Sequence, residues 1–123
     1  MIIRKEQMAA FRQLALKSFE DRAAAHIRSE FSAETRGTDD QSLRSFIQTG
    51  ILRAGKHRIT REPDVGTFLD VMVLFGADFD ESPRTRWAGE MLGDPGSSPQ
   101  QKVEGLSQRL QAELSRRRTG LHV

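Results

Sequence analysis

The chain has 123 residues, of which 37% are hydrophobic and 29% are charged, and its formal net charge is +2. This composition is typical of a folded globular protein and excludes a chain that is disordered throughout. The sequence contains no cysteine, which excludes disulfide and thiolate chemistry, so we expect a cytoplasmic protein. The longest apolar run, Val71 to Phe75, is far too short to cross a bilayer. The first residues become charged too early for a signal peptide, so we expect no leader and no membrane span.

The charges are distributed unevenly along the chain. Basic residues predominate before Pro63 and after Ser98. Between these two positions the only basic residues are Arg84 and Arg86. The acidic residues there are more numerous: Asp64, Asp70, Asp78, Asp80, Glu81, Glu90 and Asp94. One interpretation is that neighbouring helices pair their charges internally. The other is that the acidic segment docks a basic partner.

Two helices are predicted in the first half of the chain. The first begins near Arg4 and runs toward Phe31, and Thr38 then begins a capping-box pattern that starts a second helix ending at Gly55. Gly50 lies within the second helix, where we expect it to mark a close contact with another helix. The apolar faces of the two helices are expected to be Met8, Phe11, Leu14, Ala15, Phe19, Ala23, Ala24 and Ile27, then Leu43, Phe46, Ile47, Ile51 and Ala54.

The third predicted helix is the most hydrophobic. Thr60 is expected to cap it, Pro63 suits its first turn, and Gly76 ends it. Its apolar residues recur at three- and four-residue spacing and also spread around the helix: Val65, Phe68, Leu69, Val71, Met72, Val73, Leu74 and Phe75. We therefore expect a central helix that is contacted on more than one side.

Two further helices complete the predicted fold. Ser82 and Pro83 begin the fourth helix, whose inner face includes Trp87, and Ser98 and Pro99 begin the fifth. The fifth helix has a narrow apolar seam made of Val103, Leu106, Leu110 and Leu114. We predict an all-α fold, a compact five-helix domain spanning residues 1–123, with no β-sheet and with a frayed basic tail at residues 115–123.

No residue pattern in the sequence indicates catalysis or a bound cofactor. The histidines, His26, His57 and His122, lack the neighbouring ligands that zinc requires. Asp78, Asp80 and Glu81 lack the glycine and the distal glutamate of a calcium-binding loop. The serines have no nucleophile-elbow motif around them and the glycines form no phosphate-binding loop. We therefore expect no enzymatic activity, no cofactor and no metal.

Nucleic acid and membrane surfaces are the alternative partners. The second and third helices resemble a helix-turn-helix, with basic residues near their turn. The candidate recognition helix, however, begins with Glu62 and Asp64, whereas a helix in the major groove needs basic and amide side chains there. The first and last helices carry mixed charges, which are poorly suited to a membrane surface. We expect a protein partner, with homo-oligomerisation left open.

The densest motif runs from Gly50 to Asp80 and reads G-I-x-R-A-x-x-H-x-I-T-x-E-x-D-V-x-x-F-L-D-x-M-x-x-F-G-x-x-F-D, followed by Ser82-Pro83 and Trp87-Ala88. This pattern resembles a group of small, poorly characterised bacterial proteins encoded near type VI secretion spike and effector genes. The resemblance covers most of the chain and brings no enzymatic motif. It implies a role in loading, chaperoning or neutralising a secreted effector.

The sequence therefore predicts a non-enzymatic adaptor or chaperone for a type VI-like effector or spike protein. The alternatives are an immunity protein that neutralises a cognate toxin and a helix-turn-helix-like DNA-binding regulator. The candidate partner-binding residues are Asp70, Asp78, Phe79, Asp80, Glu81, Arg84 and Arg86, and Phe79 is also expected to point inward. Replacing Asp80 and Glu81 by alanine is expected to weaken a basic partner and to leave the fold intact.

Overall fold

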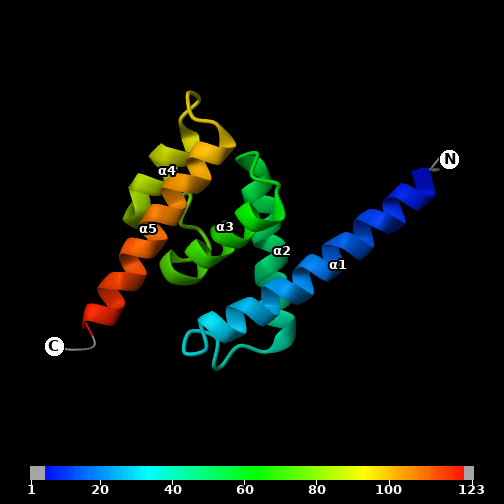
Figure 1. Cartoon of the computed structure of the whole chain (residues 1–123), viewed down its shortest axis with the longest axis horizontal. Helices are drawn as coiled ribbons and strands as arrows, with labels where there is room; N and C mark the ends of the chain where they lie inside the picture. Colours follow the sequence, from blue (N-terminus) through cyan, green and yellow to red (C-terminus); the bar gives the residue numbers. More distant parts are fainter. Residues whose placement is uncertain (1–4, 121–123) are drawn as a thin grey trace. The chain divides into compact units, whose positions relative to one another are not determined.

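The computed structural model describes the backbone of residues 5–120 and the side chains of residue 12 and residues 14–117. The described backbone forms five α-helices and one short 3₁₀ helix and contains no β-strand (Figure 1). The elements are α1 (Lys5–Glu30), α2 (Asp40–Lys56), α3 (Glu62–Phe75), η1 (Pro83–Thr85), α4 (Arg86–Gly93) and α5 (Pro99–Gly120). The prediction of an all-α fold with five helices is confirmed. No helix within residues 5–120 combines the length and the apolar character that crossing a membrane requires.

The chain divides into two compact units, residues 1–48 and residues 49–123, and the boundary falls within α2. Whether the two units behave as the single domain that the sequence led us to expect stays a prediction. The first unit contains α1 and the beginning of α2. The second contains the end of α2 and all later elements.

The first unit contains buried apolar residues and charged pairs between α1 and α2. Its buried apolar residues are Phe19, Ala24, Ile27, Phe31, Leu43 and Ile47. Arg44 pairs with Asp21 and lies 3.6 Å from Glu20. The hydrogen bond from Arg44 lowers the pKa of the Asp21 carboxyl below its usual value. This pairing agrees with the interpretation that some charges are satisfied within the chain.

The beginning of the described part of α1 differs from the predicted apolar face. Ala15 is exposed, and the side chains of Leu14 and Leu16 are 67% and 51% exposed. The burial of α1 begins only at Phe19. Met8 and Phe11, which begin the predicted face, lie outside the described side chains.

The loop between α1 and α2 is pinned by polar contacts. Arg28 donates from Nη1 to the carbonyl of Thr35 at 3.1 Å and from Nη2 to the carbonyl of Thr38 at 2.8 Å. The α2 cap is Asp39, whose Oδ1 accepts from the backbone N–H of Ser42 at 2.7 Å. We expected Thr38 in this role. Asp39 is the better acceptor because its carboxylate also interacts favourably with the positive end of the helix.

In the second unit, α2 and α3 approach closely at Gly50. A Cβ atom at this position would clash with the side chain of Leu69 and would lie 2.9 Å from the Sδ atom of Met72. A Cβ atom at Gly105 in α5 would likewise lie 2.5 Å from the Sδ atom of Met91 in α4. The prediction that Gly50 marks a close helix contact is confirmed.

The end of α2 differs from the prediction. The helix continues past Gly55, and Arg58 adopts the left-handed conformation with φ of 63°. The backbone N–H of Arg58 donates to Gly55 O and that of Ile59 to Ala54 O, each at 3.0 Å. These two bonds form a Schellman motif, in which the left-handed position is usually a glycine. The residue after Arg58, Ile59, is 1% exposed, as is usual for the hydrophobic position that follows this motif.

The first turn of α3 also differs from expectation, whereas the later helix boundaries agree. Arg61, rather than Thr60, occupies the N-cap position of α3 and makes no side-chain capping hydrogen bond. Gly76 follows the last residue of α3 with φ of 111°. Ser82 accepts from the N–H of Arg84 at 3.3 Å, so it begins the helical segment as predicted, although the first turn is 3₁₀. Ser98 and Gln101 cap α5 reciprocally, at 3.1 Å and 2.8 Å.

The last three helices share an apolar interior. The side chains of α3 that are buried are Val65, Phe68, Leu69, Val71 and Met72. α5 packs against both α3 and α4 (Figure 1), and it buries Val103, Leu106 and Leu110 of its predicted seam. α5 continues to Gly120, past Ser115, where we expected the helix to fray. Trp87, predicted on the inner face of α4, is only half-buried.

Candidate functional site

A buried carboxylate lies at the centre of the connector between α3 and η1. The side chain of Asp80 is 1% exposed. Its Oδ1 accepts from Arg53 Nη1 at 2.7 Å, and its Oδ2 lies 3.2 Å from His57 Nε2. A carboxylate oxygen only accepts, so the His57 ring donates from Nε2 in this arrangement. Asp80 thus joins the connector to the end of α2 through two donors, Arg53 and His57.

The rest of the connector, residues 76–82, is fixed by its own hydrogen bonds and by Phe79. The backbone N–H groups of Glu81 and Ser82 both donate to the carbonyl of Asp78 at 2.9 Å. Thr85 donates from its hydroxyl to the carbonyl of Phe79 at 2.6 Å. The Phe79 ring is fully buried and lies 4.9 Å from the ring of Phe68. The connector is therefore anchored by polar and apolar contacts together, and it has the character of a rigid corner.

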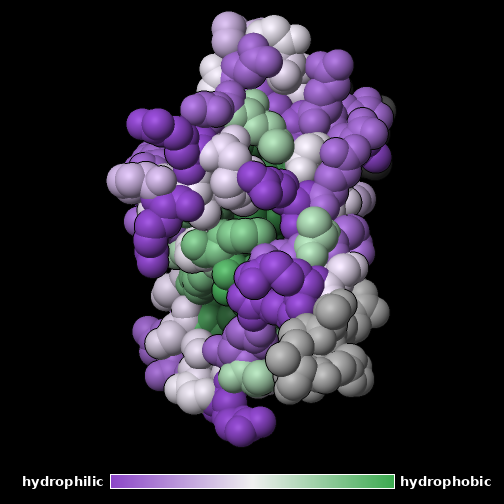
Figure 2. All heavy atoms as spheres, turned by 90° about the vertical axis from the view of Figure 1, so that its left-hand side faces the viewer, coloured by the Kyte–Doolittle hydropathy of each residue, from purple (hydrophilic) through white to green (hydrophobic). Residues whose placement is uncertain are grey.

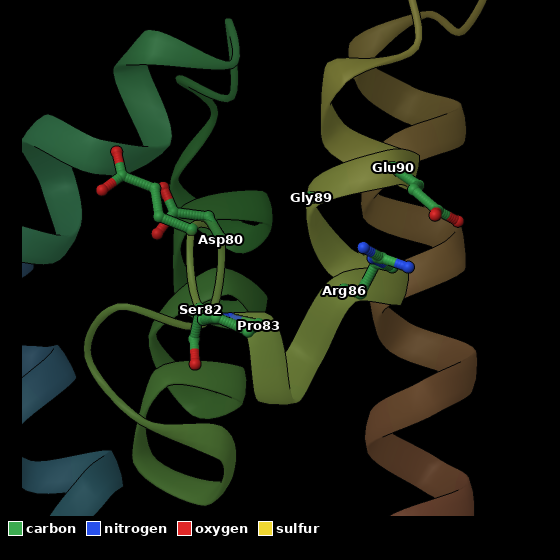
Figure 3. A pocket seen from close by; sticks show the side chains of 7 residues that line it. Asp80, Ser82, Pro83, Arg86, Gly89 and Glu90 are labelled. Carbon is green, nitrogen blue, oxygen red and sulfur yellow. The ribbon is translucent and has the colours of Figure 1, made fainter.

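A shallow, open pocket of roughly 520 Å³ lies between the connector and α4. Its lining residues are Asp80, Glu81, Ser82, Pro83, Arg86, Gly89 and Glu90. Figure 3 shows Arg86, Gly89 and Glu90 on α4, and Asp80, Ser82 and Pro83 on the opposite side of the pocket. A Cβ atom at Gly89 would lie 3.3 Å from the backbone oxygen of Asp80, so α4 and the connector touch at the base of this pocket.

The predicted partner-binding residues separate into exposed and buried groups. Asp78, Glu81, Arg84 and Arg86 are exposed, and the side chain of Glu81 is 64% exposed. Asp70 is half-buried in α3. Phe79 and Asp80 are buried, which confirms that Phe79 points inward and excludes both side chains from an accessible surface. The sequence led us to expect that Asp80 can be replaced without loss of the fold; its burial and its bonds to Arg53 and His57 lead us instead to predict that its removal destabilises the second unit.

Sequence reasoning missed the roles of Arg53, His57 and Glu90. Arg53 lies in the last turn of α2 and His57 directly follows the helix; the two are four residues apart, the spacing that places side chains on one side of a helix. This spacing was visible in the sequence, but their partner lies in a connector far along the chain and no local pattern links the two. Glu90 was assigned only to the acidic segment, and its place beside the pocket depends on how α4 packs against the connector.

The polar groups at this site are partly engaged within the chain and partly accessible. Among the side chains that the structure describes, no group of three or more His, Asp or Glu residues is placed to hold a metal ion. His57 is engaged with Asp80, and Ser82 accepts from the backbone of η1. The groups that remain accessible at the pocket are the carboxylates of Glu81 and Glu90 and the guanidinium of Arg86.

Comparison with known proteins finds no matching family model, no matching curated protein and no matching solved structure.

Proposed function

We propose that this chain is a non-enzymatic protein-binding adaptor or chaperone whose connector and pocket dock a basic segment of a partner protein. One observation carries the proposal: the buried Asp80 carboxylate, held by Arg53 and His57, fixes an acidic connector to the helical scaffold. The exposed acids beside it, Asp78 and Glu81, are therefore presented on an ordered backbone.

This order matters for the free energy of binding. Ordering a loop on association opposes binding, and a surface that is already ordered avoids much of that loss. Exposed carboxylates at the edge of an interface act mainly on the association rate and on the choice of partner. Glu81 and Glu90 suit such a role, because both are exposed and both line the pocket.

The resemblance of residues 50–80 to proteins encoded near type VI secretion genes supports a particular partner class. We propose a secreted effector or a spike protein of that kind as the partner. An immunity protein would use the same acidic surface to cover the basic cleft of a toxin, and the assay below distinguishes the two roles. Every residue of α3 from Asp64 to Phe75 is buried or half-buried, which argues against the DNA-binding alternative, because a recognition helix must expose one face to the major groove.

Co-expression with the effector and the spike protein of the same locus, followed by purification of the complex, tests this proposal. We expect one of them to co-purify with the chain. Replacing both Glu81 and Glu90 by glutamine should then lower the association rate constant by about tenfold and reduce its dependence on salt. Glu104→Gln is the matched control, because Glu104 is an exposed acid on α5 away from the pocket lining.

Two results would overturn the adaptor role. A chain that purifies alone with every partner of its locus does not act as their adaptor. A Glu81→Gln, Glu90→Gln variant that binds like the parent would assign the contact to another surface. Rescue of cells that express the toxin of the locus would instead assign the chain to the immunity class.

A further inference from the structure

An aromatic pair remains partly accessible beside the interior of the second unit. The rings of Phe75, at the end of α3, and Trp87, in α4, meet edge to face with their centroids 5.3 Å apart. Both side chains are half-buried, in contrast to Phe68 and Phe79, which are fully buried. Tryptophan at the edge of a core, with one part of the ring accessible, is enriched at sites of protein association.

An arginine of α5 covers one face of Trp87. The Cζ atom of Arg109 lies 4.4 Å from the centroid of the Trp87 ring, within the range of a cation–π interaction. Arg109 is exposed, and within the described part of the chain it makes no ion pair. Its guanidinium is therefore held in place by the ring and keeps its hydrogen-bond donors for another molecule.

A second arginine of α5 extends the positive charge along the same side of the helix. Arg117 donates to the carbonyl of Leu74 at 3.5 Å, next to Phe75 in α3. It also pairs with Glu113, which Arg116 contacts at 2.6 Å. The hydrogen bond from Arg116, together with that from Arg117, lowers the pKa of the Glu113 carboxyl. Glu113 is therefore already paired with two arginines of α5.

Apolar surface is accessible on the face of the molecule that carries α4 and α5. Figure 2 shows apolar side chains in a hollow on this face, surrounded by hydrophilic ones. Leu74 in α3 and Leu114 in α5 are half-buried, as are the two aromatic residues. An apolar centre with cations at its edge fits a ligand that offers apolar groups flanked by carboxylates.

We propose that Leu74, Phe75, Trp87, Arg109 and Arg117, which we call the Trp87 surface, bind an acidic amphipathic helix of a partner protein. The apolar face of that helix contacts Phe75 and Trp87, and its carboxylates accept hydrogen bonds from Arg109 and are attracted by the charge of Arg117. Charge complementarity selects this occupant, because α5 carries an excess of basic residues: Lys102, Arg109, Arg116, Arg117 and Arg118 against Glu104 and Glu113. An amphipathic helix that lays its apolar face on a hydrophobic surface is a common mode of peptide recognition.

This surface is separate from the acidic connector and takes a partner of opposite charge. α4 contributes to both, with Arg86 and Glu90 lining the pocket and Trp87 facing Phe75 and Arg109. A chain with two such surfaces can hold a basic and an acidic segment at once. Failure of one surface therefore leaves the other testable.

Trp87 is the only tryptophan in a chain that has no tyrosine, so its fluorescence reports on this surface alone. The probe is a synthetic helical peptide without tryptophan, carrying leucines on one face and glutamates beside them. We expect the peptide to shift the Trp87 emission in a saturable manner. Replacing Arg109 by glutamine should raise the Kd by about tenfold, as for a partly desolvated cation at the centre of an interface.

Matched controls separate specific recognition from general attraction. Arg12→Gln removes one exposed positive charge from α1, in the other unit, and should leave the Kd unchanged. The Glu81→Gln, Glu90→Gln variant should also bind the acidic peptide like the parent. Far-UV circular dichroism checks that Arg109→Gln keeps its helix content.

Five outcomes would overturn the proposal, four of them in the peptide assay. The first is an unchanged Trp87 emission on addition of the peptide, and the second is equal binding of a peptide with lysines in place of the glutamates. The third is an equal loss of affinity in Arg109→Gln and Arg12→Gln. The fourth is a single-stranded oligonucleotide that displaces the peptide and binds more tightly. A Trp87 emission that depends on protein concentration without peptide, with dimers in sedimentation, would assign the surface to a second copy of the chain and also overturn the proposal.

Discussion

Replacing Asp80 by alanine removes the acceptor that joins the connector to α2. The Arg53 guanidinium would then lose its bond of 2.7 Å and would keep only the Glu81 carboxylate, 3.8 Å away. Removing one partner of a buried ion pair typically lowers stability by about 3–5 kcal/mol. The side chains of Arg53 and His57 are 23% and 20% exposed, so water compensates part of this loss. We expect the free energy of unfolding to fall by about 2–4 kcal/mol.

Urea unfolding followed by Trp87 fluorescence measures this loss in the second unit, where Trp87 lies. Asp78→Ala is the matched control, because Asp78 is an exposed carboxylate of the same connector. Its effect should stay within about 0.5 kcal/mol. Asp80→Asn keeps an acceptor oxygen for one of the two donors. Its loss of unfolding free energy should therefore lie between those of Asp80→Ala and Asp78→Ala. If Asp80→Ala and Asp78→Ala unfold at the same urea concentration, Asp80 does not hold the connector.

Four further predictions concern the packing and the charges. Gly50→Ala should lower the free energy of unfolding by about 1–3 kcal/mol, because the added methyl group overpacks the contact between α2 and α3. Gly55→Ala, in the same helix with nothing within 4 Å of the added atom, should raise it by up to about 1 kcal/mol. Arg58→Gly should raise it by about 1 kcal/mol, since glycine adopts the left-handed conformation without strain. The stability that Glu113 contributes should be present above its ordinary pKa of 4.5 and lost as the pH falls below it, because Arg116 lowers the folded-state pKa; Glu113→Gln should flatten this part of the profile.

Each of these predictions is checked by urea unfolding, at neutral pH for the glycine and arginine variants and between pH 3 and 6, roughly, for Glu113→Gln. Equal changes for the alanines at Gly50 and Gly55 would contradict the close approach of α2 and α3. A destabilised Arg58→Gly variant would mean that the arginine side chain stabilises the turn by more than its backbone strain. If the free energy of unfolding depends on pH in the same way for the parent and for Glu113→Gln, the ionisation of Glu113 does not contribute to stability in this pH range.

Local signals in the sequence located most of the helix boundaries. Serine followed by proline marked the beginnings of η1 and α5, and Gly76 marked the end of α3, because each depends on neighbouring residues alone. The errors arose where two residues compete for the same local role. Asp39 caps α2 in place of Thr38, and Arg58 takes the left-handed position that Gly55 was expected to hold. In the second case the burial of a following isoleucine decides the turn, and burial is a property of the fold.

The candidate site was predictable in its location but only partly in its composition. An acidic corner between α3 and the next helix followed from the sequence, and so did the inward position of Phe79. The burial of Asp80 did not follow, because a carboxylate in a polar connector is ordinarily solvated. Its partners, Arg53 and His57, are brought to it only by the packing of α2 beside the connector. A pair of donors four residues apart, on a helix that otherwise buries its apolar face, is the signal that could have indicated a buried acceptor.

The two close helix contacts have a consequence for oxidation. Each places a methionine sulfur where a glycine has no side chain, Met72 at Gly50 and Met91 at Gly105. Sulfoxide formation would add a polar oxygen to a thioether that already fills this space. Met72 is 1% exposed, whereas Met91 is half-buried, so peroxide should reach Met91 first. Oxidative damage to the second unit would then begin by loosening α4 from α5, while the contact between α2 and α3 stays protected.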